Sequence, residues 1–482
     1  GVVSILALLT NLFFIFGALA SYGTVLTLPG IAGIILTIGM AVDANVIIYE
    51  RIREELRAGK SPLNAVKEGF SNSYSAIIDA NVTTILIGFI LAYFGVGPIK
   101  GFAVVLIWGV IFSFITAVWV SRMIIDYWNS RGKGLVSFWR PSTQNVLSNL
   151  KVDWLALRKK GYMFSIAITV LGLISIFTRG WELGVDFKGG YSYNIAFPEN
   201  ADVSVQDLSD ALTVSFESTP IVKSIDVGNH YNITTSYLID DTSDDAPRRV
   251  LEKLHEGINS VMGGNLDFEE FTSTGGEGTH ILSSSQVGPT MADDILSSSW
   301  KAVLIALLGV FIYIFVRFSK WQYSLGAVVA LAHDTLVILS LFSLLRGLLP
   351  FSMELDQAFV AAILTVIGYS INDTVIVFDR IRENFNSYSK KSRYELINDA
   401  INSTMSRTVI TSITTIMVII LLLLFGGSSI KGFAFAITFG IMFGVYSTIF
   451  VATPILYDLL GAGKDKVTEP EKKREKPAAV KA

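Results

Sequence analysis

The 482-residue sequence contains no cysteine, only four histidines and few charged residues, and each shortage excludes a class of site. Without cysteine, neither a disulfide framework nor a thiolate metal centre can form. The net charge of −3 gives no indication of nucleic-acid binding. No Ser-His-Asp arrangement and no pair of soluble carboxylates stands out, so we expect no enzyme activity, no cofactor and no metal. The histidines show no metal-ligand spacing and lie at His230, His255, His280 and His333.

Apolar residues are abundant instead. Hydrophobic residues make up 51% of the chain, charged residues make up 16%, and the mean hydropathy is +0.53. These values are too apolar for a soluble protein and are typical of a chain that crosses the membrane several times. We therefore expect a polytopic α-helical membrane protein. Ten apolar segments are long enough to span a bilayer, and they lie near residues 2–21, 29–49, 77–96, 101–125, 163–179, 298–317, 323–345, 358–378, 405–425 and 432–458.

Lysine and arginine are concentrated in alternate connections between these segments. Five lie in each of the connections 51–74 and 379–404, and seven lie in each of the linker 126–162 and the tail after Gly463. The other short connections carry one basic residue or none. By the positive-inside rule, the basic connections and both ends of this chain face the cytoplasm.

One long connection, residues 180–297, has the pattern of a soluble domain on the opposite side of the membrane. Strand and helix patterns follow in the order β-α-β-β-α-β, which predicts an α+β unit of ferredoxin-like type. The strands are expected near 189–197, 220–227, 231–239 and 278–285, and the helices near 204–217 and 246–262. The chain then divides into a transmembrane repeat of four helices (1–126), a cytoplasmic linker (127–162), one helix (163–179), this domain (180–297), five more helices (298–460) and a disordered tail (461–482).

An internal repeat relates the two ends of the chain. The stretch IGMAVDANVIIYERIREE, residues 38–55, has a near-copy in IGYSINDTVIVFDRIREN, residues 367–384, with the aspartate moved by one place. Further matches indicate that segments one to four copy segments seven to ten in the same orientation. This is a parallel repeat, an architecture used by transporters. Because the first half lacks the two helices and the soluble domain that the second half carries, we expect the complete protein to begin with a helix, a soluble domain and a second helix.

Several charged residues lie inside these apolar segments in one layer. Asp43 lies ~10 Å inside the cytoplasmic boundary, Asp373 ~9 Å, and Arg407 roughly 5–9 Å from the same side. Asp79 begins the third segment near this layer. A charge at such a position costs roughly 2.5–3.5 kcal/mol on insertion scales, so each of these residues is a functional candidate.

A proton relay is the functional interpretation of this layer. Burial raises the pKa of a carboxyl group, and a nearby arginine lowers it. An arginine that moved toward and away from the acid would therefore make it release and take up a proton. A proton that falls through about 100 mV supplies ~2.3 kcal/mol, enough to bias a helix bundle between two states.

Structural interpretations stay open for the same residues. Arg407 could extend to the lipid headgroups, Asp373 and Arg407 could form a static ion pair, and Asp79 could be a cap or boundary residue. Asp334, which follows His333 at about mid-membrane in the seventh segment, either faces the bundle with its hydrogen bonds satisfied or belongs to a polar relay. Composition and spacing by themselves indicate an ion-coupled membrane transporter with an extracytoplasmic domain.

Several motifs resemble those of a known family. GMAVDAN with ERIREE resembles the fourth-helix motif of SecD. GVDFKGG, QVGPTMADDIL, ALAHD, GYSINDTVIVFDRIRE and SRTVITSITT resemble successive motifs of SecF, in the order of that family. The resemblance extends from Gly1 to about Leu460 and is to a fused SecDF whose amino-terminal part is missing. One departure is Ala292, where the family often has glycine.

The resemblance implies a fold of the RND superfamily and an accessory subunit of the Sec translocon in the bacterial inner membrane. Its partners would be the translocon channel and its associated membrane subunits, the translocating preprotein, the lipid bilayer, and protons or Na⁺. The proton-motive force would help to move and release the preprotein on the periplasmic side. Asp43, Asp373 and Arg407 would be the coupling residues, with Asp79 in the same pathway.

Two other functions fit the same sequence. One is an RND-type proton-coupled exporter of small molecules or lipids. A large apolar cleft in the soluble domain would favour this function. The other is a static scaffold of the translocon, for which neutralising the aspartates would leave activity unchanged.

Overall fold

The structure is a computed structural model that describes most of the chain. It covers residues 1–461 with gaps at 24–25, 96–97, 131–136, 139–149, 199, 202, 225–228, 242, 274–277, 350, 388–390 and 427. The expected disordered tail beyond Gly461 and about half of the expected linker lie outside the described residues.

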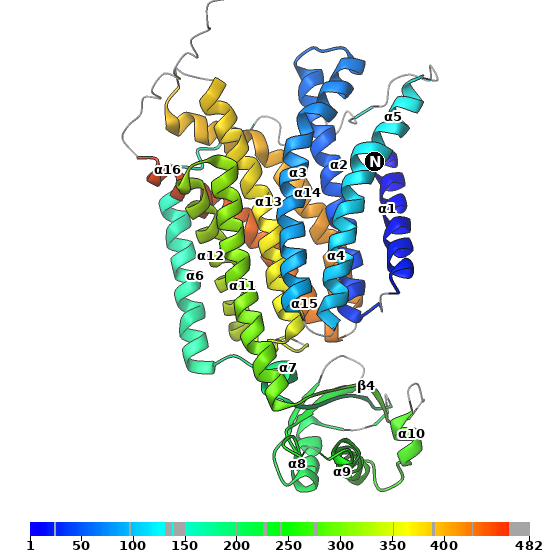
Figure 1. Ribbon diagram of the computed structural model, residues 1–482. Coiled ribbons are helices and arrows are strands. Elements are labelled where there is room, and N and C mark those ends of the chain that lie inside the picture. Colours follow the sequence, from blue (N-terminus) through cyan, green and yellow to red (C-terminus); the bar gives the residue numbers. More distant parts are fainter. Residues whose placement is uncertain are drawn as a thin grey trace, which may run out of the picture.

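Ten spans within the described chain are long and apolar enough to cross a membrane, which confirms the prediction of a polytopic helical protein. They form one bundle with a small α/β domain at one end, which we call the domain face (Figure 1). The opposite end, where the α2–α3 and α13–α14 hairpins project, is called the hairpin face. The helices are α1 (Val2–Ser21), α2 (Leu28–Arg57), α3 (Pro62–Phe94), α4 (Pro98–Ile115), α5 (Ser121–Ser130), α6 (Arg158–Arg179), α11 (Pro289–Phe318), α12 (Trp321–Leu345), α13 (Gln357–Ser387), α14 (Arg393–Phe425), α15 (Ser428–Ser447) and α16 (Thr453–Leu459).

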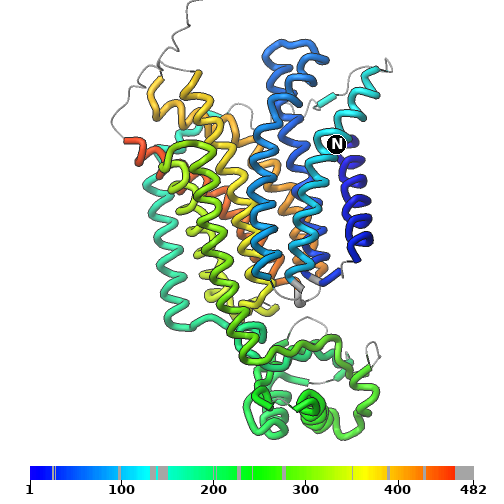
Figure 2. Tube along the Cα trace, viewed as in Figure 1, coloured from blue at the N-terminus to red at the C-terminus, as the bar shows by residue number. Residues whose placement is uncertain are grey.

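The sequence repeat is also a structural repeat. Helices α12 to α16 follow the same course as α1 to α5, and each half has one π-helical turn at the same place, Thr116–Val120 in the first and Thr448–Ala452 in the second. The two halves lie next to each other (Figure 2). At their seam the packing is reciprocal, because α3 packs against α13 and α14 packs against α2. Each half therefore contributes helices to the centre of the bundle.

Small residues allow the helices of the seam and of each half to approach closely. A Cβ atom added at Gly39 would lie 2.8 Å from a methyl group of Thr415, so α2 and α14 touch there through backbone. Gly440 has the same relation to Val366, between α15 and α13. Such small-residue contacts are the usual means by which membrane helices pack, because the lipid provides no hydrophobic drive for helix association.

The α/β domain has the topology that the sequence predicted. Its four strands form one antiparallel sheet in the order β2-β3-β1-β4, with α8 and α9 on one face and the other face toward the membrane bundle (Figure 1). The helix side is apolar, with Ile195, Leu212, Ile233 and Leu254 fully buried. The elements are α7 (Val185–Lys188), β1 (Gly190–Ala196), α8 (Val205–Phe216), β2 (Ile221–Ser224), β3 (His230–Thr235), α9 (Ala246–Val261), α10 (Phe268–Thr272) and β4 (His280–Val287).

Helix α11 begins at Pro289, nine residues before the apolar segment near 298 that the sequence indicated. Hydropathy detects only the part of a helix that lies in lipid, and the first turns of α11 carry Asp293 and Asp294. Proline at the first helical position favours an early start, because its missing N–H would be unsatisfied there anyway. The sequence boundary at 297 therefore falls inside a continuous helix.

The α/β domain is docked on the bundle by backbone pairing and charge. The N–H of Gly184 donates to the carbonyl of Leu355, and the N–H of Leu355 donates to that of Glu182, both at 2.8 Å. Lys223 of β2 forms ion pairs with Glu182 and Glu354. The domain thus rests on the connection between α12 and α13.

Two acidic side chains meet at this junction. Asp186 accepts a hydrogen bond from the N–H of Gln357, and Asp356 accepts one from the N–H of Phe359 at the start of α13. Burial and the neighbouring Asp186 carboxylate raise the pKa of Asp356 to about 7, and burial raises the pKa of Asp186 as well. Asp356 therefore favours its protonated form below about pH 7 in the docked domain, and burial shifts the pKa of Asp186 in the same direction.

Docking is expected to weaken as the pH rises through about 7. A carboxyl group with a raised pKa in the docked state stabilises that state at low pH and loses the contribution as it ionises. Hydrogen exchange of the Gly184 and Leu355 amides, corrected for intrinsic rates, should be faster at pH 8 than at pH 5. Asp356→Asn, which still caps α13, should remove most of this pH dependence. A corrected rate that does not change with pH in the native chain would contradict the prediction.

Candidate functional site

Three of the four coupling residues predicted from the sequence meet at the seam between the halves. Arg407 of α14 lies with its Nη2 3.9 Å from Oδ1 of Asp43 in α2. Asp373 of α13 lies near both, with Thr408 and Ser412 of α14 beside it. Asp373 is 6% exposed and Arg407 9%, so these charges are almost completely removed from solvent. One arginine thus faces two carboxyl groups, one from each half of the protein.

The ion pair within 4.0 Å joins Arg407 to Asp43 rather than to Asp373, which was the partner considered from the sequence. The sequence suggested that Asp373 and Arg407 would pair, because they lie on consecutive antiparallel helices of the second half. The structure differs because α14 crosses the seam and packs on α2, where Gly39 lets Thr415 approach. The arginine therefore links the two halves.

The one-place shift of the aspartate has a structural reason. The repeat offset of 329 pairs Asp43 with Asn372, and not with Asp373. The Asn372 side-chain amide lies 3.0 Å from the hydroxyl of Thr83 in α3, the first-half counterpart of α14. One residue along a helix corresponds to a rotation of about 100°, so Asp373 points to a different neighbour. The shift places both acids beside α14 and its arginine.

The contact between Arg407 and Asp43 is loose. A direct hydrogen bond between an arginine and a carboxylate measures about 2.7–2.9 Å, whereas these atoms are 3.9 Å apart. Oδ1 of Asp43 and Nε of Arg407 are buried without a hydrogen-bond partner among the described residues. A buried charge with incomplete hydrogen bonding is costly. Both groups therefore keep hydrogen-bonding capacity for a further partner, and their role in coupling stays a prediction.

A polar vestibule connects this site to the hairpin face. It has a volume of about 420 Å³ and ends at Arg407. Its walls come from the two copies of the E/D-R-I-R-E motif, which exchange ion pairs across the seam. Arg380 pairs with Glu54 at 2.8 Å, and Arg51 lies 3.9 Å from Glu383. The vestibule is therefore a charged pocket that extends to Arg407, and ion pairs between the two halves surround its mouth.

Asp79 does not join this cluster. It lies within α3, and its two oxygens accept hydrogen bonds from Tyr313 at 2.8 Å and from Nε of Arg317 at 2.8 Å, both in α11. It is thus not a helix cap. Arg317 was missed because it ends an apolar segment, where a basic residue is usually an anchor at the membrane surface. A role for Asp79 in proton coupling stays a prediction.

Asp334 and His333 form a separate polar group in the second half. Asp334 is fully buried and accepts hydrogen bonds from Ser370 at 2.9 Å and Ser447 at 2.8 Å, while Nδ1 of His333 lies 3.1 Å from its other oxygen. These contacts join α12 to α13 and α15. The arrangement fits the hydrogen-bonded interpretation, and membership of a relay stays a prediction.

The chain matches known proteins along most of its length. A family model described as protein export membrane protein SecD/SecF, C-terminal, matches residues 1–131 and 268–462. The protein translocase subunit SecDF of Brucella abortus is 33% identical over 461 residues, which are 95% of this chain and 56% of that protein. The protein translocase subunit SecF of Rhodothermus marinus is 41% identical over 314 residues, 65% of this chain and 95% of that protein.

A solved structure has the same fold. The crystal structure of SecDF, a translocon-associated membrane protein from Thermus thermophilus, matches with a TM-score of 0.82 at 32% identity. The match covers 96% of this chain and 59% of that one. The chain therefore spans little more than half the length of the SecDF proteins that it matches.

Proposed function

Because this chain belongs to the SecD/SecF family of protein-export membrane proteins, we propose that it acts with the Sec translocon and uses the proton-motive force to assist protein translocation. The observation that carries the proposal is the meeting of two carboxyl groups and one arginine at the seam of a two-half bundle. A polar vestibule leads to this site from one face, and an α/β domain is docked on the other. The arrangement supplies an ion site, an access path and an extramembrane element that could act on a polypeptide.

The coupling cycle follows from the loose ion pair. An ionised Asp43 attracts Arg407 across the seam, and protonation removes that attraction. Arg407 is then free to approach the Asp373 carboxylate, and this movement shifts α14 relative to the two halves. A proton that crosses about 100 mV supplies ~2.3 kcal/mol, which changes a two-state equilibrium about fifty-fold. A change of this size is sufficient to shift the seam between two alternative helix packings.

The orientation of the cycle rests on the charge distribution of the loops. The basic connections belong to the hairpin face, so the vestibule would open to the cytoplasm and the α/β domain would lie on the periplasmic side of the inner membrane. Protons would then enter from the domain face and leave through the vestibule. Cysteine labelling supplies the check, because these 482 residues contain no cysteine: Asn232→Cys should react only from the periplasmic side.

A larger and a smaller cavity lie where the α/β domain meets the bundle. The larger, of about 380 Å³, has serine and asparagine of the sheet along much of its wall, which supports protein export, while the smaller, of about 180 Å³, is lined mostly by apolar side chains such as Trp181 and Trp300. A large apolar cleft at this place would favour an exporter of drugs or lipids. The polar residues that line the cavity of about 380 Å³ include Ser192, Asn194, Asn232, Ser283 and Ser285.

Gradient-dependent export tests the proposed function. Inverted membrane vesicles are prepared from cells with and without the complete gene, and translocation of a preprotein is measured with the ion gradient intact or collapsed. The gradient should accelerate translocation only in vesicles that contain the protein. Selective collapse of the proton or the sodium gradient identifies the coupling ion. Equal stimulation in vesicles without the protein would refute the proposal.

The reciprocal ion pairs at the vestibule mouth predict a second effect. Joining Glu54→Cys to Arg380→Cys with a reducible bifunctional reagent should hold the two halves together and abolish gradient-driven export, and reduction should restore it. A matched control joins Lys391→Cys to Asp399→Cys, an exposed pair 2.7 Å apart within the second half, and should leave export unchanged. Full export by the cross-linked first pair would exclude movement at this mouth.

A further inference from the structure

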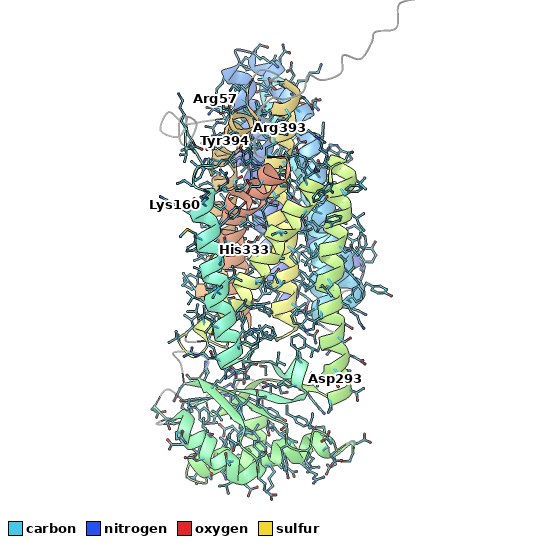
Figure 3. All side chains as sticks on the ribbon, turned by 90° about the vertical axis from the view of Figure 1, so that its left-hand side faces the viewer. Arg57, Lys160, Asp293, His333, Arg393 and Tyr394 are labelled. Carbon is cyan, nitrogen blue, oxygen red and sulfur yellow. The ribbon has the colours of Figure 1, made fainter. Side chains whose placement is uncertain are left out.

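Helix α11 is a direct connection between the α/β domain and the far side of the bundle. Strand β4 ends at Val287, and only Gly288 separates it from the first residue of α11. The helix has 30 residues, so its length is about 45 Å, against about 30 Å for the hydrocarbon core. Asp293 lies on the part that leaves the bundle toward the domain (Figure 3). A displacement of α11 would therefore displace β4.

Arg317 ties the other end of α11 to two helices of the seam. Its guanidinium donates from Nε to Asp79 of α3 at 2.8 Å, and its Nη2 lies 2.7 Å from the same oxygen. The Nη2 also donates to Ser75 at 2.9 Å and lies 3.6 Å from Asp379 of α13. Asp79 is 7% exposed and both of its oxygens are occupied, whereas the side chain of Arg317 is 21% exposed.

Two further contacts hold the same end of α11 on α13. Arg382 donates from Nη1 to the backbone carbonyl of Arg317 at 3.3 Å, which satisfies one of the free carbonyl groups at the end of the helix. The neighbouring Phe318 is 6% exposed and packs with Tyr323 and Phe378 at ring distances of 4.9 and 6.0 Å. The end of α11 is therefore held on α13 by a hydrogen bond and by ring packing.

The tethered helices are those that carry or touch the ion site. Asp79 lies one helical turn before Thr83, which contacts Asn372, the residue next to Asp373. Asp379 lies six residues after Asp373 on the same helix. A continuous chain of contacts thus runs from the ion site through α3 and α13 to Arg317, and from there along α11 to β4.

We propose that Arg317 is the positioning residue that transmits movement of α3 and α13 to the α/β domain, with Asp79 as its anchor outside the proton path. The inference rests on the proposed function and assigns the mechanical link within it. Without the Arg317 tether, α3 and α13 shift past α11, and the ion site works without moving the domain. Proton flux and export then separate.

Proton flux and export are therefore measured together in vesicles that contain the full protein in equal amounts. Arg317→Gln should keep gradient-driven proton flux within about twofold of the native value and lose at least tenfold in gradient-dependent export. Arg317→Lys keeps one charge without the planar fork and should restore part of the export. Arg317→Gln leaves the Asp79 carboxylate buried without its partner and could therefore assemble poorly. The double variant Asp79→Asn with Arg317→Gln removes this charge, and it should show the same near-native proton flux and the same loss of export. Arg122→Gln, which breaks an exposed pair with Asp126, is the control and should match the native protein.

A spin-label distance provides the readout that separates transmission from fold support. Labels at Asn232→Cys in β3 and Ala58→Cys on the α2–α3 hairpin should change their separation when the gradient is applied to the native protein, and should not do so in the double variant. A proportional fall of flux and export would overturn the proposal, as would native export in the double variant. Loss of flux in the double variant but not in Arg317→Gln would place Asp79 in the proton path and also overturn it. Absence of gradient-dependent export in the native protein would refute the proposed function itself, while the distance change still tests the tether.

Discussion

Asp373→Asn is expected to assemble normally and to lose the gradient-dependent part of export, by at least tenfold. Asparagine is nearly isosteric with aspartate and can stay beside Thr408 and Ser412, but it can neither take up nor release a proton. Asp43→Asn should behave in the same way, because Asp43 faces the same arginine from the other half. The measurement is gradient-driven translocation in vesicles that contain equal amounts of each variant.

The displaced aspartate of the repeat provides a matched control. Exchanging the neighbours, Asn372→Asp with Asp373→Asn, keeps the composition and the depth of the acid but turns it toward Thr83 and α3. Because the acid would no longer lie beside α14, gradient-driven export should stay as low as in Asp373→Asn. Recovery of export in the exchanged variant would mean that depth alone decides the function. Full stimulation in both single Asn variants would exclude these carboxyl groups as proton carriers.

Arg407→Gln is expected to lose both stability and coupling, and a second substitution should separate the two effects. Removing the arginine leaves Asp43 and Asp373 buried without a counter-charge, which costs about 3 kcal/mol when one partner of a buried pair is removed. Arg407→Gln with Asp43→Asn removes one of the uncompensated acids, so much of the lost stability should return. Coupling should stay absent, because no cation then moves between the two halves.

Thermal unfolding in detergent and export in vesicles measure the two effects. The double variant should unfold at a temperature several degrees above that of Arg407→Gln, and both should lack gradient-driven export. Arg407→Lys should also export poorly, because lysine lacks the planar fork and loses its proton more readily when buried. If Asp373→Asn restored the stability of Arg407→Gln and Asp43→Asn did not, Asp373 would be the dominant partner of Arg407, contrary to the 3.9 Å contact with Asp43.

The local features of the site could be predicted because they depend on short stretches of sequence. A charge in an apolar segment is visible from its neighbours, and its depth follows from the rise of the helix. Asp43, Asp373 and Arg407 were therefore assigned to one layer, and the structure brings them together. Arg317 gave no such signal, since an arginine at the end of an apolar segment is ordinary.

The sequence by itself determined the number of membrane spans, the repeat, the order of strands and helices in the α/β domain and the layer of buried charges. Each of these follows from periodicity or composition along a continuous stretch. Only the tertiary structure decided the partners: Arg407 with Asp43, Asp79 with Arg317, and the exchange of ion pairs at the vestibule mouth. These contacts join residues more than two hundred positions apart. Their choice depends on which helices touch and how each is rotated, and that is set by close contacts such as Gly39 against Thr415, to which hydropathy is insensitive.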